Sequence, residues 1–73
     1  MPLYILDIGW EGREYSELLW FPNLEAAEAE AKGIAEEIIS QLGTVNVIVY
    51  ICDSQKLILK AIFVDYESIP RSS

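Results

Sequence analysis

Hydrophobic and polar residues alternate with a period of two near the start of the chain, a pattern typical of β-strands. Residues 3–10 and residues 15–21 both show this alternation. Residues 11–13 lie between them, and Gly12 there can take the positive φ of a tight turn. Pro22 ends the second segment because proline has no N–H to donate to a sheet. The pattern predicts a β-hairpin.

A helical pattern follows Asn23, which is a favourable N-cap residue. The segment is rich in alanine, the residue with the highest helix propensity, and Gly43 stands where a C-terminal cap glycine belongs. We therefore predict one amphipathic helix over residues 24–42. Its apolar stripe consists of Leu24, Ala27, Ala31, Ile34, Ala35, Ile38 and Leu42.

The second half of the chain contains two more strand-like segments, residues 44–52 and residues 56–64, separated by a polar turn at residues 53–55. Residues 67–73 contain serines and a proline without apolar periodicity. We expect one domain over residues 1–66 and a frayed C-terminal tail.

The order of elements is therefore ββαββ, an α+β fold. If the third strand lies beside the first, every neighbouring pair of strands is antiparallel. Antiparallel pairs are the commoner kind, so we prefer a four-stranded antiparallel sheet in the order 2-1-3-4, with one helix packed on one face.

One helix covers only one face of such a sheet, yet the second hairpin is apolar on both faces. A solvated face would show clean alternation of apolar and polar residues. An uncovered apolar patch usually marks an interface, although sheet twist, loops or the tail could cover part of it. We select Ile48, Tyr50 and Ile62 as candidate interface residues, and a homodimer is the simplest form that the interface can take.

Charge is distributed unevenly along the 73 residues. Twelve acidic and five basic residues give a net charge of −7, which argues against direct binding of nucleic acid or an anionic membrane. Residues 1–43 account for the whole net charge. Two interpretations of the acidic helix face stay open: it serves solubility alone, or it is complementary to a basic partner. The candidate partner-binding residues are Glu11, Glu14, Glu25, Glu28, Glu36 and Glu37, with the aromatic residues Trp10 and Tyr15.

Familiar catalytic and metal-binding motifs are missing from the sequence. There is no histidine and only one cysteine, and the four glycines form no phosphate-binding loop. We expect no enzymatic activity, cofactor or metal, and we interpret Cys52 as a small buried hydrophobe. A carboxylate pair, Asp7 with Glu17 on adjacent strands, is the alternative that an enzyme would require. The single cysteine and a start without a targeting segment favour a cytoplasmic protein.

Two stretches resemble a family of short uncharacterised bacterial proteins. The chain opens Met1-Pro2-Leu3-Tyr4, and its helix begins at Leu24 with Leu-Glu-Ala-Ala-Glu-Ala-Glu-Ala. Members of that family open Met-Pro-x-Tyr and carry a Leu-Glu-Ala-Ala-x-Ala-Glu-Ala helix between two hairpins. The resemblance implies a ββαββ fold and no known activity. In size and acidity the chain is also similar to small inhibitors such as anti-CRISPR proteins, and to antitoxins.

These observations favour a small, acidic, non-enzymatic protein-binding module. The leading hypothesis is an inhibitor or decoy that occupies a basic, nucleic-acid-binding surface of a protein partner. The alternative is a constitutive homodimer formed through the uncovered sheet face.

Overall fold

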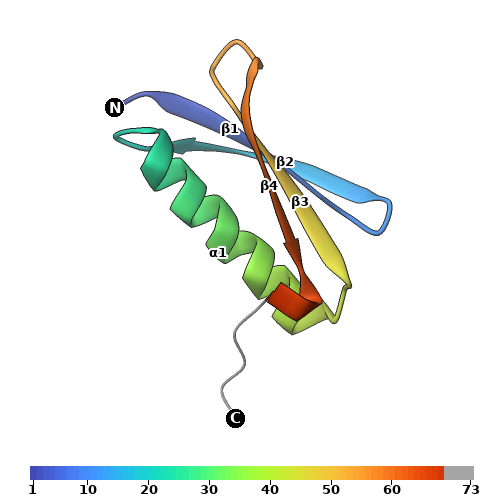
Figure 1. The fold of residues 1–73 in the computed structure, drawn as a ribbon. Coiled ribbons are helices and arrows are strands. Elements are labelled where there is room, and N and C mark those ends of the chain that lie inside the picture. Colours follow the sequence, from blue (N-terminus) through green and yellow to red (C-terminus); the bar gives the residue numbers. More distant parts are fainter. Residues whose placement is uncertain (69–73) are drawn as a thin grey trace.

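The computed structural model describes residues 1–68, and it shows a four-stranded sheet with one long helix beside it (Figure 1). All neighbouring strands are antiparallel, and the strand order β2-β1-β3-β4 confirms the predicted topology. The elements are β1 (Leu3–Trp10), β2 (Arg13–Trp20), α1 (Leu24–Leu42), β3 (Asn46–Cys52), β4 (Ile58–Asp65) and the short 3-10 helix η1 (Tyr66–Ser68).

The first turn is shorter than the sequence indicates. Glu11 and Gly12 both have positive φ, 47° and 76°, and together they form a two-residue turn of the kind that suits strand twist. Arg13 therefore pairs with Trp10, and β2 begins at this residue rather than at Tyr15. A non-glycine residue rarely takes a positive φ, which is why the pattern alone predicts a longer turn.

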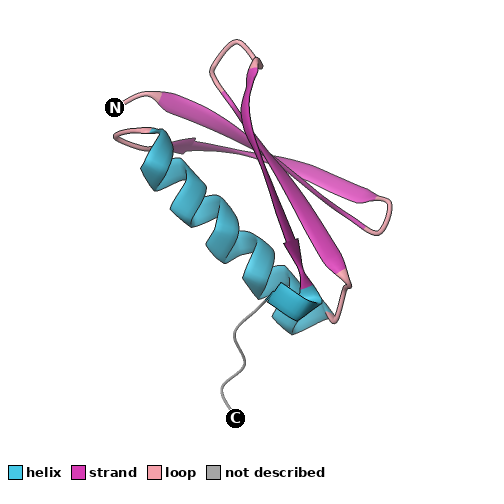
Figure 2. Ribbon diagram, viewed as in Figure 1, coloured by secondary structure: helices cyan, strands magenta, loops and turns pink. Residues whose placement is uncertain are grey.

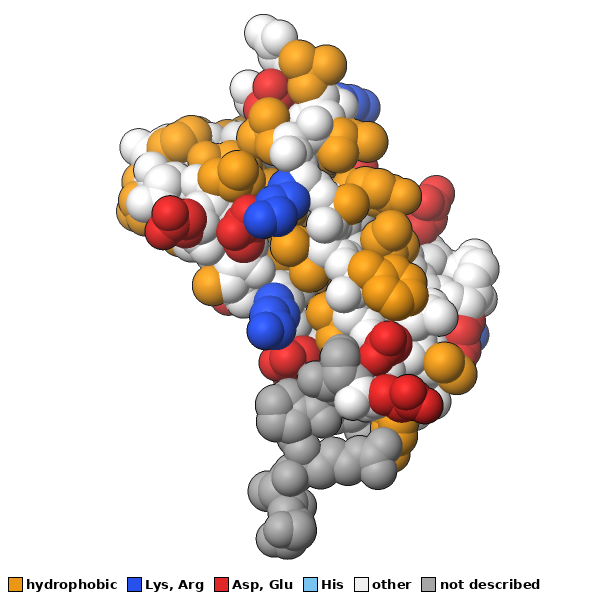
Figure 3. Space-filling model, in the orientation of Figure 1, with side chains coloured by type: hydrophobic (Ala, Val, Ile, Leu, Met, Phe, Trp, Pro, Cys, Tyr) orange, Lys and Arg blue, Asp and Glu red, His pale blue; other side chains and the backbone are white. Residues whose placement is uncertain are grey.

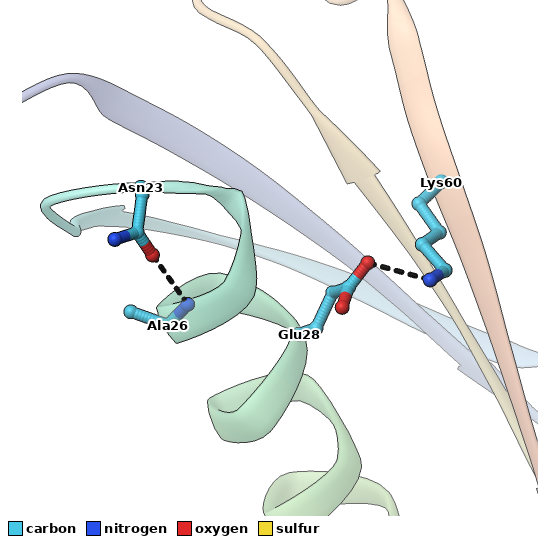
Figure 4. Close-up of polar contacts among 4 residues, drawn as sticks. All are labelled: Asn23, Ala26, Glu28 and Lys60. Carbon is cyan, nitrogen blue, oxygen red and sulfur yellow. Dashed lines mark hydrogen bonds and ion pairs between the residues drawn. The ribbon is translucent and has the colours of Figure 1, made fainter.

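Both predicted helix caps are present. The Asn23 side chain accepts a hydrogen bond from the backbone N–H of Ala26 at 2.9 Å, as Figure 4 shows. At the other end Gly43 is left-handed, with φ 69°, and its N–H donates to the carbonyl of Ile39 at 2.9 Å. These bonds satisfy backbone groups that the helix itself leaves unpaired, so α1 has the predicted bounds.

The second hairpin has a wider turn than predicted. Asp53 Oδ1 accepts from the backbone N–H groups of Gln55 and Leu57, and Lys56 has a positive φ of 68°. Strand β4 consequently begins at Ile58 and ends at Asp65. The predicted C-terminal tail begins in η1, and its last five residues, 69–73, lie outside the described residues.

The core lies between α1 and one face of the sheet, which we call the inner face. Fully buried side chains from β1 and β3 meet small side chains of the helix. Because alanines line this side of α1, the helix axis can lie close to the strands. The central members are Leu6, Ile8, Val47, Val49 and Ile51 from the sheet, with Ala27, Ala31, Ala35 and Ile39 from the helix.

Helix α1 does not cover the inner face evenly. It packs mainly on β3 and β4, touches β1 less, and leaves much of β2 uncovered. Figure 2 shows that the helix lies on one side of the sheet and that the β1–β2 hairpin points away from its C-terminal half. The position of α1 therefore leaves open the opposite face of the sheet and part of the inner face.

Replacing Ala31 by leucine tests the close contact between helix and sheet. Ala31 is fully buried, whereas Ala29 on the same helix is exposed. Overpacking a core costs about 1–3 kcal/mol, so Ala31→Leu should lower the free energy of unfolding by that amount in urea denaturation. Ala29→Leu, the matched control, should change it by less than about 0.5 kcal/mol. Equal effects of the two substitutions would contradict the packing described here.

Candidate interaction surfaces

The face of the sheet opposite α1, here called the outer face, is rich in exposed apolar side chains. Leu18, Trp20, Ile58 and Phe63 are between 61% and 64% exposed. They come from the two edge strands, β2 and β4. In the space-filling view, hydrophobic side chains form a band alongside β4 (Figure 3). Such large side chains gathered on one face are typical of an interaction surface.

Strand register arranges the outer face in three rows that cross all four strands, because directly paired residues share a face. Leu3 and Trp20 form a further pair on this face, beyond the first row. The first row is apolar throughout, the second is mixed, and the third carries a carboxylate at its β2 end. In the order β2, β1, β3, β4, the rows are Leu18, Ile5, Cys52, Ile58; then Ser16, Asp7, Tyr50, Ala61; then Glu14, Gly9, Ile48, Phe63.

Asp7 occupies the middle of the outer face and holds two hydrogen bonds. Its Oδ1 accepts from the hydroxyl of Ser16, and its Oδ2 accepts from the thiol of Cys52 at 3.8 Å. Burial raises the pKa of Cys52, and the negative charge of Asp7 and the hydrogen bond to it raise this pKa further. Cys52 is 2% exposed, which confirms the small buried side chain predicted from the sequence, and its raised pKa keeps the thiol protonated at neutral pH.

The acidic residues selected from the sequence are divided among different surfaces. Glu25 and Glu37 are exposed on α1 and Glu36 is half-buried there, while Glu11 and Glu14 lie in the first hairpin. Glu28 forms an ion pair with Lys60 of β4 at 2.7 Å (Figure 4), and it is therefore less available to a partner. This pair links the helix to the sheet, although half-exposed pairs contribute only about 0–1 kcal/mol.

A groove of about 360 Å³ separates β2 from the C-terminal half of α1. Trp10 and Tyr15 pack edge to face beside it, with ring centroids 5.7 Å apart. Burial raises the pKa of Tyr15, and the carboxylates of Glu17 and Glu37 raise it further. The groove therefore has negative charge on both sides. Its main lining residues are Tyr15, Glu17, Ile34, Glu37, Ile38 and Leu42.

A larger hollow of about 490 Å³ lies where the end of α1 meets β3 and η1. Its lining includes Phe63 and the buried Thr44, whose hydroxyl has no hydrogen-bond partner among the described residues. Among residues 1–68, no three His, Cys, Asp or Glu side chains lie close enough together to hold a metal ion.

Two groupings proposed from the sequence are corrected by the strand register. Ile62 pairs with Val49 and packs against the core, so it lies on the inner face and cannot share an interface with Ile48 and Tyr50. Asp7 pairs with Ser16, whereas Glu17 pairs with Leu6. The two carboxylates therefore lie on opposite faces of the sheet and cannot act together as an acid–base pair.

Sequence reasoning also missed the four most exposed apolar residues of the outer face, Leu18, Trp20, Ile58 and Phe63. Leu18 and Trp20 stand at alternate positions of β2, and this alternation is the sequence pattern that places both on one face. Their exposure, however, depends on which face the helix covers, and in the second hairpin both faces are apolar.

The chain has no match among protein-family models, curated proteins or solved structures. The resemblance to short bacterial proteins and the likeness to small inhibitors stay predictions. No helix within the described residues is long and apolar enough to cross a membrane. The surfaces themselves are therefore the basis for any functional conclusion.

The Asp7–Cys52 contact makes a prediction about thiol reactivity. Asp7→Asn removes the charge that raises the pKa of Cys52, so the pH profile of alkylation by iodoacetamide should shift to lower pH. Glu14→Gln, on the same face but not in contact with the thiol, is the control and should leave the profile in place. An unchanged midpoint in the Asp7 variant would show that the carboxylate does not act on the thiol.

Proposed function

We propose that this protein is a non-enzymatic protein-binding module that forms a homodimer through its outer face. The observation that supports this proposal most directly is the concentration of exposed apolar side chains on the face that α1 does not cover. Exposing such side chains to water is unfavourable, and a second copy of the chain offers the same apolar surface. The dimer would be a two-sheet sandwich with the helices on its outside.

The available area is adequate for a stable pair. Six large side chains contribute most of the surface, and together they expose on the order of 700 Å². A typical specific interface buries about 800 Å² on each partner. These six residues are Leu18, Trp20, Tyr50, Ile58, Leu59 and Phe63. Leu59 is the extra residue at the β-bulge beside Ile58, and it alternates with Lys60, which faces α1.

The position of the charges favours one symmetry for the sandwich. A two-fold axis across the strands would place Asp7 against the partner's Asp7, and like charges facing each other are unfavourable. A two-fold axis parallel to the strands instead places each row over the same row of the partner. Strand β1 then lies over the partner's β3, and β2 lies over the partner's β4. Leu18 then faces the partner's Ile58, and Asp7 faces the partner's Tyr50, whose hydroxyl can donate to the carboxylate.

Such a dimer would keep the acidic helices on its outside. A second candidate function, capture of a protein with a basic surface, is therefore compatible with the first. The acidic sides of the groove between α1 and β2 favour it. An inhibitor or decoy would use these carboxylates to imitate a phosphate backbone, and the dimer would present two such surfaces.

Substitution on the outer face tests the dimer directly. Phe63→Asp places a charge in the apolar surface and should convert the dimer to a monomer in light scattering across a dilution series, because a buried unpaired charge is strongly unfavourable. Val45→Asp is the matched control, since Val45 is equally exposed but lies outside the three rows. A wild-type chain that is monomeric at every concentration would refute the proposal.

Tyr50→Phe tests the symmetry. The substitution removes only the hydroxyl that we place against the partner's Asp7, and a hydrogen bond to a charged group contributes about 1.5–3 kcal/mol. The dissociation constant of the dimer, measured by sedimentation equilibrium, should rise about tenfold or more. Tyr4→Phe, which removes a hydroxyl on the inner face, should leave it unchanged. If Tyr50→Phe leaves the dissociation constant unchanged, the axis parallel to the strands is wrong, whereas the dimer itself is tested by Phe63→Asp.

A further inference from the structure

We propose that the groove between β2 and α1 binds an amphipathic helix of another protein, one whose apolar side chains are flanked by lysine or arginine. This inference rests on the second candidate function proposed above, capture of a protein with a basic surface, and states the chemistry of that partner. It concerns the inner face and does not depend on the dimer through the outer face. It rests on the width of the uncovered surface, the apolar residues that line it and the charges beside them.

The uncovered part of the inner face is wide enough for one helix. Four strands spaced about 4.8 Å apart form a sheet about 15–19 Å wide, while a helix with its side chains is about 10–12 Å across. Helix α1 lies over β3 and β4 and leaves the side above β2 open. A second helix beside α1, at the usual interaxial distance of about 8–10 Å, would complete the layer.

The apolar lining continues along α1 at the spacing that helix packing requires. Ile34, Ile38 and Leu42 are four residues apart and face the groove, so they form a ridge about 12 Å long. Tyr15 lines the opposite side and is 42% exposed. Ile34 and Ile38 are half-buried and Leu42 is exposed, which leaves apolar surface for a partner's side chains to cover.

The charges beside this apolar ridge determine which kind of helix the groove can bind. Glu17 lies on the strand side of the groove and Glu37 on the helix side, and no lining residue is basic. Gln41 also lines the groove and donates a hydrogen bond to Glu37 at 3.0 Å, so the Glu37 carboxylate lies on the groove side of the helix. Lysine or arginine on both borders of an apolar stripe would meet these carboxylates, whereas an acidic segment would be repelled.

An extended peptide is a poorer fit than a helix. A β-strand would add to the free edge of β2 through backbone hydrogen bonds, and it would extend the sheet without covering Ile38 or Leu42. A helix laid in the groove contacts both walls through side chains at positions i, i+4 and i+8. The geometry therefore favours the helix-in-groove mode of recognition.

The test uses a synthetic peptide of about 18 residues, long enough to span the groove as a helix. It carries leucine at helical spacing with lysine on both borders of the leucine stripe, and isothermal titration calorimetry measures its affinity. The double variant Glu17→Lys/Glu37→Lys should lower this affinity at least tenfold. The matched control, Glu25→Lys/Glu36→Lys, changes the charge of the chain equally at residues that do not line the groove and should lower affinity less than threefold.

Three outcomes would overturn the inference. One is the absence of binding to the peptide, and another is an equal loss of affinity in the two double variants, which would indicate attraction by net charge alone. The third is equal binding of a scrambled peptide with the same composition but no apolar stripe. Circular dichroism and light scattering on each variant would show that fold and oligomeric state are preserved, so a failed groove is distinguishable from a failed dimer.

Discussion

The contact between one alanine-lined helix and two strands of a four-stranded sheet determines most of this structure. Ala27, Ala31 and Ala35 are fully buried, and their small side chains let α1 pack closely on β3 and β4. A helix is narrower than four strands, so it cannot cover the inner face and has no access to the outer one. Both proposed binding surfaces are exposed because one helix is too narrow to cover the sheet.

The helix and the strand order could be predicted because local chemistry determines them. Asn23 and Gly43 specify both ends of α1 through cap hydrogen bonds, and the preference for antiparallel neighbours gives the order of the strands. The turns were less predictable, since Glu11 and Lys56 take positive φ values that are unusual for residues with side chains.

The binding surfaces were harder to predict because they depend on where elements meet. Glu28 has Lys32 at a favourable helical spacing, yet in the fold it pairs with Lys60. The groove beside Tyr15 exists because α1 lies over β3 and β4 rather than over the middle of the sheet. No local sequence pattern predicts this position of the helix. Likewise, the separation of Asp7 from Glu17 follows from a register in which Asp7 pairs with Ser16 and Glu17 with Leu6, which the shorter first turn establishes.

The two proposed interfaces lie on opposite faces of one sheet and differ in chemistry. The outer face is broad and largely apolar, which suits a permanent partner. The groove combines a narrow apolar ridge with carboxylates, which suits a partner that must be selected by charge. If both form, a dimer presents two separate grooves on its outer sides, and binding in one need not disturb the sheet contact.

The central pairing of β1 with β3 also determines how the chain can fold. Each hairpin closes through contacts between residues near in sequence. Ile5 pairs with Cys52, however, only once the two hairpins have come together, and contacts between residues so distant in sequence slow folding. An isolated hairpin is only marginally stable in water, and the core needs residues from both halves. During synthesis, β1 therefore remains without its central neighbour until β3 has been made, and the core cannot be completed before that point.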